Sequence, residues 1–222
     1  MIISLALDIL TPFFILVQKL KKCFCIALCI TSHGLPSEIL MTSTRKTNPQ
    51  LKTFEVIQWS EVGADDIDAM FMRQAMLLAE EAQAIGEVPV GALVVVDSTI
   101  IGQGYNQSIS KHDPTAHAEL IALKEAALNL QNYRVVDATL YVTLEPCPMC
   151  AGALVHGRIK RIVFGAYDYK SGAVGTVMNL AQHEALNHKM DVIGGCLQDE
   201  CSAQISAFFK KRRMQKKMLS DK

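Results

Sequence analysis

Three residues with metal-binding side chains lie in two short segments of this 222-residue chain. His117 opens the first segment, His-Ala-Glu, and Cys147 and Cys150 frame the motif Pro-Cys-Pro-Met-Cys. One imidazole and two thiolates suit zinc, and three protein ligands leave the fourth tetrahedral position open to water. An open position is typical of a catalytic zinc site rather than of a closed structural one.

The first segment also contains a candidate proton carrier, Glu119. Zinc lowers the pKa of a bound water from about 15.7 to roughly 7, so hydroxide becomes available at neutral pH. A carboxylate beside the metal can take a proton from that water, pass it to a ring nitrogen and help to protonate departing ammonia. The order H-x-E, then P-C-x-x-C, is typical of zinc-dependent nucleobase deaminases.

Two other interpretations of the cysteines stay open at the level of sequence. Cys196 or Cys201 could supply a fourth ligand and close a structural zinc site, which would leave Glu119 without a role. The C-x-x-C spacing could also belong to a redox pair, although that interpretation gives His117 no part.

Both candidate segments are expected to begin helices. Pro148 suits a first helical turn, where its missing N–H costs nothing, and Cys147 and Cys150 then share one helix face. His117 and Glu119, two positions apart, converge only near a helix start, where side chains lean toward the N-terminus. One metal ion can therefore lie between two helix N-termini, whose dipoles also favour thiolates.

Hydrophobic periodicity and turn residues predict alternating helices and strands after residue 64. The first amphipathic helix has apolar residues at helical spacing, namely Ile67, Phe71, Ala75, Leu78 and Ala82. The expected strands are Gly91 to Val96, Thr99 to Tyr105, Thr139 to Leu144, Arg161 to Ala166 and Met190 to Gly194. The first two form a hairpin through Asp97 and Ser98. Further helices are expected at His117 to Asn132, around the cysteines and at Asp199 to Lys217.

Two stretches are expected to be irregular: Gln107 to Thr115 as a polar loop, and Tyr167 to Lys189 as loop around a short helix. The predicted inward stripe of the helix after His117 consists of Leu120, Leu123, Ala127 and Leu130. In the final helix the inward residues are Cys201, Ile205 and Phe208. Alternating strands and helices predict an α/β domain of three layers, with a central mixed sheet of about five strands flanked by helices.

The first 64 residues differ in composition from the rest, so we expect a leader at 1–64 and a deaminase domain at 65–222. Residues 1–30 are apolar but interrupted by charges, and no uncharged run reaches the roughly 18 residues of a membrane span. A secretory signal is also a poor match. We expect that residues 1–40 are not part of the working protein, that translation starts at Met41 or later, and that 41–64 is a polar, disordered lead-in; a weak membrane anchor is the alternative. Cys23, Cys25 and Cys29 are expected to be incidental.

Composition sets few limits on partners, because the formal net charge is zero and no global field attracts nucleic acid or membrane. A local basic cluster crowds the final helix: Lys210, Lys211, Arg212, Arg213, Lys216 and Lys217. Such a cluster is either a solvated helix end that complements the dipole or a set of phosphate contacts. Seven cysteines without framework spacing favour a reducing, cytoplasmic setting, and we expect no membrane partner.

The residues around these motifs resemble bacterial tRNA-specific adenosine deaminases from about Met70 to Arg213. The similar stretches are Glu87 to Ala92, Asp113 to Glu119, Asn132 to Arg134, Leu140 to Cys147, Met149 to Ala153 and Phe164 to Ala166. The resemblance implies a cytidine-deaminase-like fold, a homodimer, one zinc ion per subunit, and conversion of adenosine to inosine at the wobble position of a tRNA anticodon stem-loop.

The resemblance also implies roles for individual residues. His117, Cys147 and Cys150 would bind zinc, and Glu119 would donate protons. Asn106 would help to hold the flipped nucleoside, and Asp168 would lie near the bound RNA. Without the resemblance, Asn106 is a turn residue at a strand end and Asp168 is a solvated loop charge. Two other functions stay open: a free nucleobase or nucleoside deaminase of the guanine or cytosine type, and a zinc-stabilised interaction module without catalysis.

Overall fold

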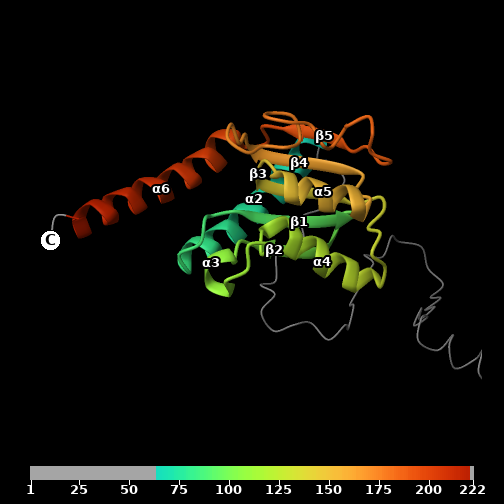
Figure 1. Ribbon diagram of the computed structural model, residues 1–222. Coiled ribbons are helices and arrows are strands. Elements are labelled where there is room, and N and C mark those ends of the chain that lie inside the picture. Colours follow the sequence, from blue (N-terminus) through green and yellow to red (C-terminus); the bar gives the residue numbers. More distant parts are fainter. Residues whose placement is uncertain (1–63, 221–222) are drawn as a thin grey trace, which may run out of the picture. The chain divides into compact units, whose positions relative to one another are not determined.

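A mixed sheet of five strands forms the middle layer of the structure, a computed structural model that describes residues 64–220. The strands are β1 (Gly91–Val96), β2 (Thr99–Tyr105), β3 (Thr139–Leu144), β4 (Arg161–Ala166) and β5 (Asp191–Gly194). Their order in the sheet is β2-β1-β3-β4-β5; β1 is antiparallel to β2 and β3, whereas β3, β4 and β5 are parallel (Figure 1). The predictions for the leader fall on residues outside this described part.

The first four strands begin and end at the predicted residues, and β5 begins one residue later than predicted, at Asp191. The hairpin between β1 and β2 is confirmed. Its two turn residues, Asp97 and Ser98, both have positive φ angles, of 46° and 60°. Positive φ at both central residues is typical of the hairpin turns whose twist matches that of the flanking strands.

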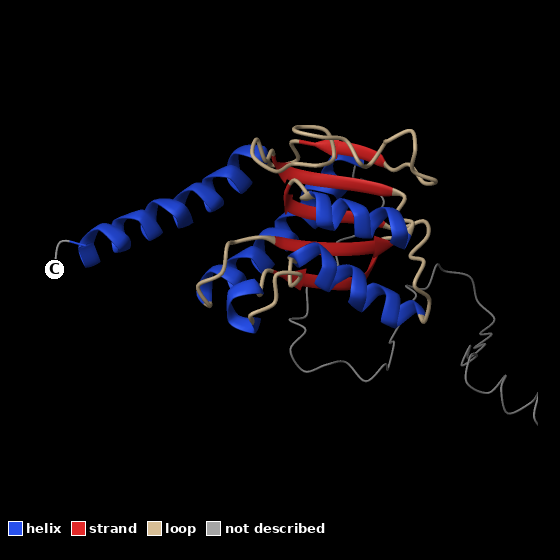
Figure 2. Cartoon of the chain, viewed as in Figure 1, coloured by secondary structure: helices blue, strands red, loops and turns tan. Residues whose placement is uncertain are grey.

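Helices cover both faces of the sheet, which gives three layers (Figure 2). On one face lie α4 (Ala118–Leu130) and α5 (Pro148–Gly157), whose alanines and leucines join the strands in one apolar core. On the other face lie α2 (Ala64–Ala84) and the first turns of α6 (Gln198–Ser220), with a second core around Phe71. The predicted α/β class, with a mixed sheet flanked by helices, is confirmed.

The last helix, α6, continues beyond the sheet (Figure 1). Of its predicted inward residues, Cys201 and Phe208 are buried and Ile205 is half-buried. Every residue from Phe209 to the end of the helix is exposed, so the basic cluster is open to solvent. None of the helices between residues 64 and 220 is long and apolar enough to cross a membrane.

The predicted inward stripe of α4 is wrong in part. Leu123 and Ala127 pack against the core, but Leu120 is only half-buried and Leu130 is exposed. The buried positions of α4 are instead Ala118, Glu119, Ala122 and Ala126. Small residues and one carboxyl therefore replace the leucines on the face that meets the sheet.

Two glycines of β2 explain why small residues occupy the buried face of α4. A Cβ atom on Gly102 would lie 2.2 Å from the carbonyl oxygen of Ala122, and one on Gly104 would lie 2.6 Å from that of Ala118. The helix backbone thus rests directly on the strand backbone, and only alanine-sized side chains fit between them. The close approach brings the first turn of α4, with the motif His-Ala-Glu, against the sheet.

The predicted polar loop at 107–115 contains one short helix, α3 (Ser108–Lys111). The buried carboxylate of Glu87 accepts a hydrogen bond from the backbone N–H of Ser110, at 2.7 Å. His112 then ends the turn in the left-handed conformation. A side chain more than twenty positions earlier therefore stabilises this turn, which local sequence does not reveal.

A partly buried ion pair joins α2 to strand β4, and Tyr141 of β3 shares its carboxylate. Asp68 accepts hydrogen bonds from both terminal nitrogens of Arg161, at 3.0 and 2.5 Å, and from the Tyr141 hydroxyl, at 2.8 Å. Burial and the hydrogen bond to Asp68 raise the pKa of Tyr141, so its hydroxyl stays protonated and donates. The hydrogen bonds to Asp68 likewise raise the pKa of Arg161.

We expect Asp68→Ala to lower the free energy of unfolding by roughly 2–3 kcal/mol, because Arg161 and the Tyr141 hydroxyl lose their shared acceptor. The cost stays below that of a fully buried pair because the Arg161 side chain is 28% exposed. Urea denaturation measures this change in the free energy of unfolding. The control Tyr141→Phe removes one donor only and should cost about 1 kcal/mol. A change under about 0.5 kcal/mol for Asp68→Ala would show that the network does not stabilise the fold.

Candidate active site

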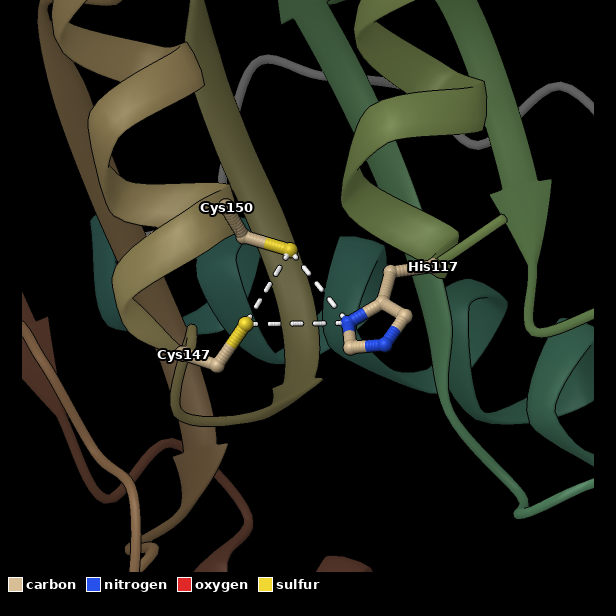
Figure 3. A group of neighbouring side chains, drawn as sticks. All are labelled: His117, Cys147 and Cys150. Atoms are coloured by element: carbon tan, nitrogen blue, oxygen red, sulfur yellow. Dashed lines mark hydrogen bonds between the residues drawn. The ribbon is translucent and has the colours of Figure 1, made fainter. Parts of the chain in front are cut away.

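The side chains of His117, Cys147 and Cys150 converge on one point (Figure 3). The Nδ1 atom of His117 lies 3.7 Å from the sulfur of Cys147 and 3.5 Å from that of Cys150, and the two sulfurs are 3.7 Å apart. Tetrahedral zinc, with bonds of about 2.1 Å to nitrogen and 2.3 Å to sulfur, requires separations of about 3.6 Å (N–S) and 3.8 Å (S–S). The three donors therefore fit a zinc ion in both kind and spacing.

The helix starts position these three side chains as predicted. His117 is the N-cap residue of α4 and Cys147 that of α5, both with extended backbone, and Pro148 follows at the first helical position. Neither N-cap side chain makes a capping hydrogen bond. The carbonyl oxygen of the Asn106 side chain instead accepts a hydrogen bond from the backbone N–H of Ala118, at 2.9 Å. Asn106 thus caps α4, and the imidazole of His117 is left to face the two cysteines.

Proton sharing links the three donors. The hydrogen bond between the sulfurs and the one to His117 lower the pKa of Cys147 to about 4, although burial opposes this. The same sulfur–sulfur contact, together with burial, raises the pKa of Cys150. The hydrogen bond to Cys147 raises the pKa of His117. Cys147 is therefore the readier thiolate, and a divalent ion would take the place of the shared protons.

Glu119 lies in the first turn of α4 beside this cluster and is only 4% exposed. Burial raises the pKa of its carboxyl, which also forms a hydrogen bond with Cys150. Glu119 does not belong to the group of three possible ligands. A buried carboxyl with a raised pKa, next to a metal site but outside it, is suited to accept and return protons.

Cys196 and Cys201 lie away from the cluster. Both belong to the core between the sheet and the helices α2 and α6, on the face opposite α4 and α5. The Cys201 sulfur would lie 2.4 Å from a Cβ atom on Gly165, so it packs directly on strand β4. Within residues 64–220, the predicted ligands therefore form a three-residue group to which neither cysteine contributes.

Asp168 follows β4 and is half-buried. Its carboxylate accepts hydrogen bonds from the backbone N–H of Lys170, at 2.9 Å, and from the backbone and hydroxyl of Ser171, at 3.2 and 2.6 Å. Burial acts against ionisation, yet these hydrogen bonds lower the pKa of Asp168. Asp168 is thus an organised loop residue rather than a freely solvated charge.

Glu145, which sequence reasoning passed over, connects this loop to the cysteine motif. Its carboxylate is 2% exposed and accepts hydrogen bonds from the backbone N–H groups of Asp168, Val174 and Thr176, at 3.1, 3.3 and 3.0 Å. The Thr176 hydroxyl donates a fourth, at 2.5 Å. The only available signal was an acidic residue directly before Pro-Cys.

The short helix predicted within 167–189 is absent, although the structure describes this whole segment. Three backbone N–H groups of the segment are bound instead by the side chain of Glu145. The N–H of Ala173 also donates to the carbonyl oxygen of Pro146, at 2.9 Å. The loop after β4 is therefore attached to the residues that lead into Cys147.

Comparison with known proteins gives consistent matches. The family model of the MafB19-like deaminases matches residues 66–213. The tRNA-specific adenosine deaminase of Haemophilus influenzae is 54% identical over 154 residues, which cover 69% of this chain and 89% of that protein. The tRNA-specific adenosine deaminase of Bacillus subtilis is 46% identical over 150 residues, with 68% and 93% covered. A solved structure from a study of A-to-I editing by tRNA:A34 deaminases at the wobble position superposes with a TM-score of 0.59 at 38% identity; the match covers 61% of this chain and 98% of that chain.

Proposed function

This chain belongs to the tRNA-specific adenosine deaminases, within the MafB19-like deaminase family, and on that basis we propose that it hydrolyses adenosine to inosine at the wobble position of a tRNA anticodon. The observation that carries the proposal is the cluster of His117, Cys147 and Cys150 with Glu119 buried against it. A binding module without catalysis would have no use for that glutamate.

We propose that these three ligands hold one zinc ion per chain, since their identity and their separations match tetrahedral zinc. When bound, zinc supplies an acidic water, the nucleophile of the hydrolysis. Glu119 accepts a proton from the water that attacks C6 and delivers it to the adenine ring. It then takes the proton of the hydroxyl group newly bound to C6 and passes it to the amino group, which leaves as ammonia while the C6 carbonyl forms. Its burial keeps the proton transfer out of bulk solvent.

Asn106 and Asp168 complete the proposed site. Asn106 lies at the end of β2 and holds the first turn of α4 in place through Ala118, so its amide group stands close to the ligand His117 and can donate a hydrogen bond to the nucleoside. Asp168 presents a carboxylate at the end of β4, where it can accept hydrogen bonds from a base edge or from a 2′-hydroxyl of RNA.

The proposed working unit is a homodimer in the cytoplasm. The resemblance to the family supports the dimer, and the free thiols of Cys147, Cys150 and Cys201 suit a reducing compartment. Size-exclusion chromatography with light scattering tests the dimer: a mass of one chain at micromolar concentration would contradict it.

The substrate is tested by incubating zinc-loaded protein with a tRNA anticodon stem-loop that has adenosine at the wobble position. Digestion to nucleosides should then yield inosine, with free adenosine, cytidine and guanine as parallel substrates. Bases unpaired in a loop avoid much of the energy needed to extrude a base from a duplex. Rapid turnover of guanine or cytidine without inosine in the RNA would establish the free-nucleobase deaminase instead.

The exposed basic end of α6 is expected to contact phosphates. Replacing Lys210, Lys211, Arg212 and Arg213 with glutamine should weaken stem-loop binding and flatten its salt dependence. The slope of log Kd against log salt should fall by roughly 0.7 for each lost single-strand contact, and somewhat more for duplex. Fluorescence anisotropy at several salt concentrations measures Kd and therefore this slope.

The control for this prediction replaces two other cations, Arg134 and Lys160, which precede β3 and β4 in the chain. Both are exposed, so their loss changes the net charge without touching α6. An equal slope for wild type and the α6 variant would assign the cluster to helix solvation alone.

A further inference from the structure

Two exposed tyrosines follow β4, at the end of the sheet where β3 leads into the cysteine motif. Strands β3 and β4 are parallel neighbours, so their carboxyl ends lie at the same end of the sheet. After β3 it leads through Glu145 and Pro146 to Cys147, and after β4 it leads to Tyr167 and Tyr169. Ligands of open α/β sheets bind outside the carboxyl ends of the strands.

Three aromatic rings at this end of the sheet contact one another in succession. Phe164, in β4, meets Tyr167 edge to face with ring centroids 5.0 Å apart. Tyr167 in turn lies nearly parallel to Tyr169, at 26° and 6.3 Å. Phe164 is buried, Tyr167 is 37% exposed and Tyr169 is 78% exposed. The series thus leads from the core to solvent and ends in an uncovered ring.

The loop that bears Tyr169 is held firmly. Asp168, its neighbour, is bound through its own N–H to the buried carboxylate of Glu145, and its side chain closes the turn onto Lys170 and Ser171. Exposing the apolar surface of an aromatic ring to water is unfavourable, and in a flexible loop the ring could turn toward the protein. Here the fixed backbone and the ring of Tyr167 keep it at the surface.

We propose that Tyr169 is a substrate-specificity residue that stacks on a nucleobase flanking the reactive adenosine; this inference rests on the proposed function. Proteins read single-stranded RNA loops chiefly by stacking splayed bases on aromatic side chains. Tyr169 stands one residue from Asp168, on the loop attached to the residues that lead into Cys147. The adjacent Lys170 is exposed and can meet a phosphate of the same nucleotide.

The test compares Tyr169→Ala, Tyr169→Phe and Tyr169→Trp with wild type on the anticodon stem-loop. Loss of one stacked base corresponds to about a 5- to 150-fold weaker binding, so Tyr169→Ala should raise Kd and KM within that range. Phenylalanine and tryptophan should restore wild-type values, because stacking needs only the ring. The salt slope should stay unchanged, since no phosphate contact is lost.

A spectroscopic arm detects the stack itself. Stem-loops with 2-aminopurine at either position next to the reactive adenosine should lose fluorescence on binding wild-type protein and stay bright with Tyr169→Ala at saturation. The control Tyr133→Ala removes another exposed tyrosine, three residues beyond the end of α4, and should match wild type.

Two results would overturn the inference while the proposed function stands: wild-type Kd and quenching in Tyr169→Ala, or a Tyr169→Phe variant as weak as Tyr169→Ala, which would indicate a hydroxyl contact. Unchanged zinc content and circular dichroism establish that the variants are folded. Failure of the proposed function is recognised separately, because wild-type protein would then form no inosine in the stem-loop.

Discussion

Glu119→Gln is expected to remove almost all turnover and to leave the zinc content at one ion per chain. Glutamine keeps the shape of the buried side chain but cannot exchange a proton, so the rate should fall by roughly 10²- to 10⁴-fold. Glu119 lies against the ligand cluster and outside it, which is why the metal should remain. Inosine formation measures the rate, and inductively coupled plasma mass spectrometry measures the metal.

The matched control for this substitution is Glu125→Gln, on the same helix. Glu125 accepts a hydrogen bond from the backbone N–H of Gln103, at 2.9 Å, and has no part in the proposed chemistry. It should retain near-wild-type turnover. A Glu119→Gln protein that had lost its zinc would identify Glu119 as a ligand and remove the proposed proton carrier.

Cys150→Ala is expected to lose both the metal and the activity. Cys150 is fully buried, and its sulfur lies 3.5 Å from the His117 nitrogen, as one of the three proposed zinc ligands. With two ligands left, zinc affinity should collapse and turnover with it. The midpoint of thermal unfolding should also lose its dependence on added zinc, because a metal that binds only the folded state stabilises it.

Cys201→Ala is the control for the loss of a buried thiol. Cys201 packs on β4 in the opposite core, so its removal should lower stability but keep zinc and activity. Full zinc content in Cys150→Ala would contradict the three-ligand site, and zinc loss in Cys201→Ala would revive a closed site with four ligands.

The sequence was sufficient wherever one segment decides its own structure. Strand β1 is a continuous apolar run, and its bounds, like those of β3, were predicted to the residue. The grouping of His117, Cys147 and Cys150 could also be predicted, because H-x-E and C-x-x-C combine residue types that few other roles require. The cysteine helix began where Pro148 indicated that it should.

Predictions failed where a side chain or backbone far away in the sequence determines the local structure. The inward face of α4 depends on Gly102 and Gly104, which admit the helix backbone so closely that alanines replace leucines. The loop after β4 takes its course from Glu145, a carboxylate more than twenty residues earlier. Neither contact has a signal within the segment that it shapes, and the capping of α4 by Asn106 is likewise a tertiary contact.

The proposed chemistry is tested most directly by locating the inosine. A stem-loop with adenosine at the wobble position and at further loop positions is treated with zinc-loaded protein, reverse-transcribed and sequenced, and inosine is read as guanosine. We predict conversion at the wobble position alone, with free adenosine turned over far more slowly because it lacks the flanking contacts that position the base. Equal conversion of all loop adenosines, or free adenosine consumed as fast as the stem-loop, would contradict a wobble-specific tRNA deaminase.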